Sequence, residues 1–250
     1  MDYDHLASLV GRDLTAYLTR RIPELVGPVY AVTLYVEDYY GVGIATEAEF
    51  QRRASAPYYQ QVPEVLHGPA GLRWRSGEWD IPADPFLTEE TEEALAPLTR
   101  PMRDVELDVP DELVCAALHR YEEVAHRALE RATPLPMLPS SALVWVELAD
   151  SDEAVPRTES MLRTNPTDRL RETFPEWRRL AEILPAVRAD PDRVREIRER
   201  VDSGAEVRRD QPSPDELTAL LRSCGLGPGI VLTDDHDELY RVLKLANRLS

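Results

Sequence analysis

Two β-rich runs follow each other closely near the start of the chain, and this pair restricts the fold more than any other feature. Val29–Val36 reads VYAVTLYV and Tyr40–Ala45 reads YGVGIA. β-Branched and aromatic residues of this kind favour strands. Because a short polar turn through Glu37 and Asp38 separates the runs, the sequence predicts a β-hairpin.

Helical patterns surround this hairpin. Apolar residues recur at helical spacing over Asp4–Arg21, and Pro23 ends the pattern. Thr46 with Glu49 three residues later has the form of a capping box, which predicts a helix over Glu47–Ala54. The sequence also predicts strands at Leu72–Ile81 and Leu143–Leu148, and helices at Glu89–Leu98 and Pro110–Arg131.

Beyond about Asp150 the chain changes to short helical patterns separated by proline and glycine. We therefore expect an α+β fold, with a small, mainly antiparallel sheet packed by helices and a helical C-terminal region. The expected division is an α+β domain over residues 1–155 and a helical region over 156–250, either packed on the first or independent. The predicted helices of this region are Thr167–Phe174, Pro175–Leu184, Pro191–Val201, one capped at Ser213, and Asp235–Leu249.

The charge of the chain is strongly negative. The 250 residues carry 46 acidic and 29 basic side chains, for a net charge of −17. Twelve carboxylates lie between Ser76 and Glu112, where the only basic residues are Arg100 and Arg103. Such a field repels phosphate backbones and anionic lipids, so we expect neither a nucleic acid nor a membrane as partner. It attracts a basic partner protein.

The sequence also indicates a compartment. The first residues, Met1–His5, have neither a basic start nor an apolar run, and no segment reaches the length of apolar residues that a membrane span needs. Two cysteines, Cys115 and Cys224, are too few for a disulfide framework. We therefore expect a cytoplasmic protein with reduced thiols, and the oligomeric state stays open.

No pattern in the chain specifies a catalytic, metal or cofactor site. His119/Glu123 and Glu122/His126 each lie four residues apart on the helix that begins near Pro110, but no third ligand accompanies them, which favours a solvated helical face. The acids of Asp234–Glu238 fit a helix start, and Gly225–Gly229 fits a helix stop and turn. Cys115 is predicted near the apolar side of its helix, and no GxSxG is present. We predict no catalytic residue, no metal and no cofactor.

The candidates for partner binding combine aromatic, arginine and acidic side chains. Aromatic residues and arginine are enriched at protein interfaces, and the acids of the middle third would meet a basic surface. The alternative places the tryptophans in the core and pairs the arginines with nearby acids. The candidates are Tyr39, Tyr40, Arg73, Arg75, Trp79, Glu89, Glu90, Glu92 and Glu93.

Val29–Glu49, followed by Leu72–Trp74 and Glu78–Trp79, resembles the bacterial family catalogued as domain of unknown function 4303. The shared features are a leading helix, a tyrosine-containing strand, a hairpin, a Thr-Glu helix start and a tryptophan-containing strand, over about residues 5–180. The resemblance implies an immunity-type protein that binds and neutralises a toxin, and it implies no active-site residue.

Three hypotheses for function follow from these observations. The first is an acidic cytoplasmic protein-interaction module, most specifically an immunity-type inhibitor of a basic partner protein such as a toxin. The second is an enzyme with an unrecognised active site, which predicts a deep pocket joining polar residues from separated segments, for instance Tyr40, Arg73 and Glu78. The third is a non-catalytic regulatory subunit.

Overall fold

The computed structural model describes residues 2–37, 39–60, 64–79, 84–103, 111–148, 153–203, 216–227 and 236–250. The chain forms two compact units that are discontinuous in sequence. The sheet unit comprises Met1–Phe50, Ser76–Ser151 and Arg163–Asn165, and the helical unit comprises Gln51–Arg75, Asp152–Leu162 and Pro166–Ser250. The domain boundary predicted after residue 155 stays a prediction.

The sheet unit confirms the α+β fold. The predicted hairpin is present, because β1 (Val29–Val36) pairs antiparallel with β2 (Tyr40–Thr46). β4 (Leu143–Leu148) lies parallel to β1 on its other side, and the two-residue β3 (Asp84–Pro85) pairs antiparallel with β2. The strand order is β3-β2-β1-β4. The sheet is therefore mixed, with two antiparallel pairings and one parallel pairing.

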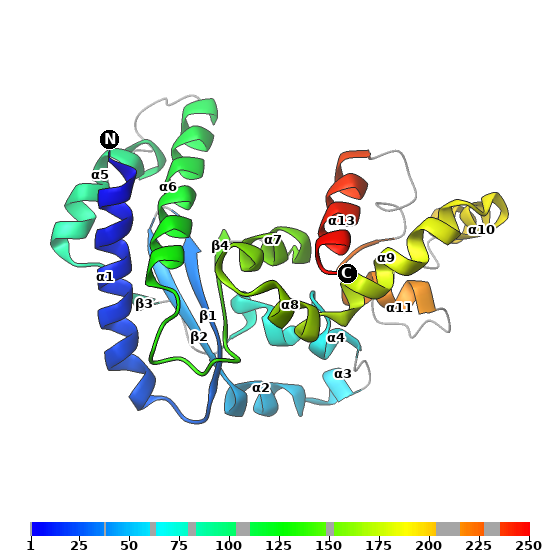
Figure 1. The fold of residues 1–250 in the computed structure, drawn as a ribbon, viewed down its shortest axis with the longest axis horizontal. Helices are drawn as coiled ribbons and strands as arrows, with labels where there is room; N and C mark the ends of the chain where they lie inside the picture. The colour runs from blue at the N-terminus through cyan, green and yellow to red at the C-terminus, as the bar shows by residue number, and fades with distance from the viewer. Residues whose placement is uncertain are drawn as a thin grey trace. The chain divides into compact units, whose positions relative to one another are not determined.

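Helices cover one face of this sheet. Strand side chains alternate between faces, so Val32, Leu34 and Val36 point the same way, and all three belong to one apolar core. Leu14 of α1 (Tyr3–Arg21) and Leu129 of α6 (Asp111–Ala132) lie in the same core. Figure 1 shows α1 and α6 side by side, with α5 (Glu89–Arg103) next to them. The predicted helices at these places are confirmed.

The opposite face of the sheet carries large aromatic rings over a glycine. Trp79 packs edge-on against Trp145 of β4, with ring centroids 5.6 Å apart. A Cβ on Gly43 would lie 2.9 Å from side-chain carbons of Thr33 and Tyr35, and 3.3 Å from the ring of Trp79. Only glycine leaves room for this packing.

The strand predicted at Leu72–Ile81 is wrong. Leu72–Trp74 and Ser76–Glu78 form two short 3-10 helices. Their backbone groups bond locally, from Trp74 N to Gly71 O and from Trp79 N to Ser76 O, each at 3.0 Å. The two tryptophans are buried through these turns and not through the alternation of a strand. Residues 80 and 81 lie outside the described residues.

Helices make up the described part of the helical unit. Most of the predicted helices are confirmed, and Asp190 caps one of them by accepting hydrogen bonds from the amides of Asp192 and Arg193 at 3.1 Å. The predicted start at Ser213 lies outside the described residues, and the helix over Ala154–Thr164 was not predicted. None of the helices described is long and apolar enough to cross a lipid bilayer. The helices are α3 (Pro57–Gln60), α4 (Glu64–His67), α8 (Thr167–Thr173), α9 (Pro175–Arg188), α10 (Pro191–Asp202), α11 (Glu216–Ser223) and α13 (His236–Arg248); α2 (Glu47–Ala54) and α7 (Ala154–Thr164) have residues in both units.

Replacing Gly43 tests the packing of the aromatic face. We expect Gly43→Ala to lower the free energy of unfolding by about 1–3 kcal/mol, because the new methyl group overlaps side chains that are held in place. Gly77→Ala is the control, since a Cβ there meets no atom within 4 Å. Chemical denaturation of both variants measures the difference. Equal stability of the two would contradict the described packing.

Candidate functional site

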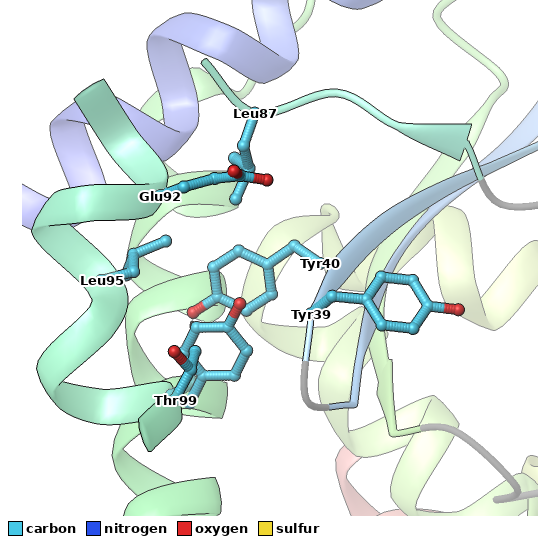
Figure 2. A pocket seen from close by; sticks show the side chains of 7 residues that line it. Tyr39, Tyr40, Leu87, Glu92, Leu95 and Thr99 are labelled. Carbon is cyan, nitrogen blue, oxygen red and sulfur yellow. Dashed lines mark hydrogen bonds between the residues drawn. The ribbon is translucent and has the colours of Figure 1, made fainter. Parts of the chain in front are cut away.

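A pocket of about 120 Å³ lies in the sheet unit, where the β1–β2 hairpin approaches α5 and α6. It unites three of the predicted partner-binding residues, Tyr39, Tyr40 and Glu92, with side chains that the sequence did not single out. The lining residues are Tyr39, Tyr40, Leu87, Glu92, Leu95, Thr99 and Tyr121. Figure 2 shows the pocket and labels all of them except Tyr121.

Two buried tyrosines form one side of the pocket. The rings of Tyr40 and Tyr121 stack with centroids 3.8 Å apart and an angle of 8° between their planes. The Tyr40 hydroxyl donates a hydrogen bond to the main-chain carbonyl of Tyr121. Burial, and next the neighbouring Tyr121, raise the pKa of Tyr40 well above its usual value, so this phenol stays protonated. The Tyr40 hydroxyl therefore remains a hydrogen-bond donor, and its bond links β2 to α6.

The neighbouring side chains of the pocket come from α5 and the segment before it. Glu92, Leu95 and Thr99 lie on one face of the helix, because they are three and four residues apart. Leu95 and Thr99 are buried, and Glu92 is exposed. Figure 2 shows Glu92 beside Leu87, while the ring of Tyr39 is directed away from the other labelled side chains. The pocket thus joins apolar and aromatic walls to a single carboxylate at its edge.

A buried carboxylate on α1 holds the start of α5 in place. Asp13 accepts hydrogen bonds from the Thr88 amide at 2.9 Å, the Thr88 hydroxyl at 2.8 Å and the Thr91 hydroxyl at 2.6 Å. Arg12 bridges the two helices, with Nε 2.9 Å from Asp13 and Nη1 2.9 Å from Glu90. Burial raises the pKa of Asp13, but the hydrogen bonds from Thr91, Thr88 and Arg12 outweigh it and place the pKa below its usual value.

The four predicted glutamates occupy the first turns of α5 and are all exposed. Acids at this end of a helix also complement its macrodipole, which gives them a structural role. Glu90 is paired with Arg12. In the described part of the chain, Glu89, Glu92 and Glu93 have no cationic partner. The acidic surface that the sequence predicted is thus partly neutralised at one of its four positions.

The remaining partner-binding candidates make local contacts. Trp79 is only 8% exposed and packs on Tyr30 and Trp145. In the helical unit, Arg75 Nε donates to the carbonyl of Ala70 at 2.9 Å. The guanidinium of Arg73 lies 5.6 Å from the ring centroid of Trp74. These contacts match the alternative interpretation of core tryptophans, and a partner-binding role for these three residues stays a prediction.

In the described residues, the structure does not bring together the three polar residues named for the enzyme hypothesis. Tyr40 belongs to the sheet unit and Arg73 to the helical unit, and the side chain of Glu78 lies outside the described residues. The acidic side chains of residues 234–238 lie outside them as well.

The histidine-containing face of α6 differs from its prediction. His126 is buried, so the expectation that it belongs to a solvated face is wrong. The reason is that α6 packs against both α1 and α5. Glu122 lies 3.6 Å from both His119 and His126, and the bond to His126 is the main cause that lowers the pKa of Glu122.

Cys115, predicted near the apolar side of α6, is exposed. Within the described ranges, no group of three or more His, Cys, Asp or Glu residues is arranged to hold a metal ion.

Comparisons with models of protein families, with curated proteins and with solved structures found no match for this chain. The resemblance stated from Val29–Glu49 therefore stays a prediction.

Replacing Asp13 tests the contact between α1 and α5. We expect Asp13→Asn to lower the free energy of unfolding at neutral pH by about 1–3 kcal/mol, because the amide keeps only part of the accepting capacity of the carboxylate. The folded-state pKa of Asp13 lies below the unfolded value of about 3.9. Its stabilising effect is therefore complete above about pH 4 and is lost as the pH falls through the folded-state pKa.

The measurement is chemical denaturation of both proteins from pH 7 to pH 2. The gap between wild type and Asp13→Asn should narrow toward low pH, whereas Asp202→Asn, at an exposed aspartate without an ion pair in the described residues, should follow the wild type throughout. A constant gap would mean that the charge of Asp13 does not contribute.

Proposed function

We propose that this chain is an acidic, cytoplasmic protein-interaction module, most specifically an immunity-type inhibitor that binds a basic partner protein. The binding surface in this proposal is the start of α5 with the pocket next to it. The observation that carries the proposal is that exposed carboxylates without a cationic partner in the described chain adjoin a pocket with aromatic walls. This combination offers both attraction and contact area to a basic surface.

The local charge remains negative after its internal compensation. Five carboxylates gather at this place, from Asp13 and the four glutamates of α5. Arg12 supplies one positive charge, and the N-terminus of a helix contributes the equivalent of roughly half a charge. These offset less than half of the carboxylates. A basic partner is therefore attracted over about the Debye length, which is roughly 8 Å at physiological salt.

The class of partner follows from chemistry and from the sequence resemblance. The net charge of −17 disfavours nucleic acids and anionic membranes. Enzymes that act on nucleic acids carry basic clefts, and an acidic inhibitor that covers such a cleft blocks access by substrate. The resemblance of the hairpin region to immunity-type proteins supports the same class.

Neutralising the acidic surface tests this proposal. The variant carries Glu89→Gln, Glu90→Gln, Glu92→Gln and Glu93→Gln, and the wild type is first used to isolate a partner from host cells at native expression. The partner is then purified, and its affinity is measured from 50 to 300 mM NaCl. We expect the variant to bind at least about tenfold more weakly at low salt and with a shallower salt dependence. An inhibitor also lowers the activity of the partner at equimolar concentration.

A matched variant separates the local surface from the total charge. Glu153→Gln, Glu172→Gln, Glu199→Gln and Asp202→Asn remove the same number of exposed charges outside the acidic stretch, and this variant should bind within about twofold of wild type. The proposal is overturned if no partner is found, if both variants weaken binding equally, or if neither changes it.

A further inference from the structure

We infer that the pocket beside α5 receives a single arginine side chain, with the guanidinium at Glu92 and the methylene chain against Leu87 and Leu95. This inference rests on the proposed function and names the chemical group of the partner that the pocket recognises. It is carried by the pocket walls and by the partners of each acidic side chain around them.

The walls match an apolar stem that ends in a cation. Leu87 and Leu95 offer aliphatic surface, and Tyr40 and Tyr121 offer aromatic surface. Glu92 is the only charged side chain among the lining residues. A neutral apolar group would leave this carboxylate without compensation, and an anion would be repelled. Long basic side chains bury their stems on apolar surface while the charged end stays near water.

The size of the pocket limits its occupant to one side chain. Pockets for drug-sized ligands measure about 300–1,000 Å³, and this pocket measures about 120 Å³. Between the two long basic side chains, the guanidinium of arginine is more weakly hydrated than an ammonium group, packs on aromatic faces and pairs with a carboxylate through two hydrogen bonds. The aromatic walls and the single carboxylate therefore favour arginine over lysine.

The chain keeps the carboxylate at the pocket available. Glu90 of the same helix turn is paired with Arg12 at 2.9 Å. Glu92 has no cationic partner in the described residues. The other polar groups that line the pocket are neutral hydroxyls, so Glu92 is the charged acceptor that the lining offers to a guanidinium.

The test is a titration of the full chain followed by two-dimensional amide NMR. The probe is N-acetyl-L-arginine amide, and the comparisons are N-acetyl-L-lysine amide and the neutral isostere N-acetyl-L-citrulline amide. We expect saturable shifts at Tyr39, Leu95 and Thr99 with a Kd on the order of millimolar. Binding of the lysine and citrulline probes should be at least about threefold and fivefold weaker, respectively.

Two single variants locate the charge that binds. Glu92→Gln should weaken binding of the arginine probe about fivefold or more, since it removes the carboxylate at the pocket. Glu153→Gln is the matched control, because it removes an equal exposed charge away from the glutamates of α5 and does not line the pocket, and it should stay within about twofold of wild type.

The inference is overturned by shifts that do not saturate or that lie elsewhere, by equal binding of citrulline or lysine, or by equal effects of the two variants. Its failure differs from that of the proposed function. If the partner protein binds through the acidic surface but the arginine probe does not enter the pocket, only the pocket assignment is lost. If the probe binds but no partner protein is found, only the proposed function is lost.

Discussion

The contact between a buried carboxylate of α1 and the start of α5 is the constraint on which the candidate surface depends. Asp13 accepts from the amide of Thr88, which a helix start leaves without an intrahelical partner, and from the hydroxyls of Thr88 and Thr91. One side chain therefore caps a helix that is distant in sequence. The position of α5 then fixes both the exposed glutamates and one wall of the pocket.

The two faces of the sheet are used differently. One face is aliphatic and packs against α1 and α6, in the manner expected from the alternation in β1. The other face holds the buried carboxylate of Glu147, which accepts hydrogen bonds from the Trp145 indole at 3.1 Å and from the Ser76 hydroxyl. Trp79 lies over Gly43 on the same face. The close packing at Gly43 and the hydrogen bonds to buried Glu147 both give this face a defined arrangement.

The sequence predicted the elements whose signals are local. The hairpin followed from β-branched residues on both sides of a polar turn, and the helix over Glu47–Ala54 followed from Thr46, whose hydroxyl accepts from the Glu49 amide at 3.3 Å. The segment Leu72–Ile81 misled the prediction because aromatic residues such as its tryptophans favour strands, while its backbone closes two local 3-10 turns. The sequence named Tyr39, Tyr40 and Glu92 separately but had no signal that joins them.

The other members of the pocket were missed for a physical reason. Leu95 and Thr99 have the spacing of any amphipathic helix, and Tyr121 belongs to the apolar stripe of α6. Their meeting depends on how α5 packs against α6. That packing depends on Asp13. Nothing in the sequence around Asp13 indicates that its partners are Thr88 and Thr91, far along the chain. Tertiary hydrogen bonds of this kind leave no periodicity to detect.

The stacked tyrosines have a consequence for how fast and how tightly a partner binds. Tyr40 is the first residue of β2, and its bond to the carbonyl of Tyr121 fixes the end of the hairpin to a long helix before anything arrives. A preorganised surface loses little conformational entropy on association, so little of the binding free energy is offset by ordering this protein. Complexes made on such a surface differ from one another mainly in residence time.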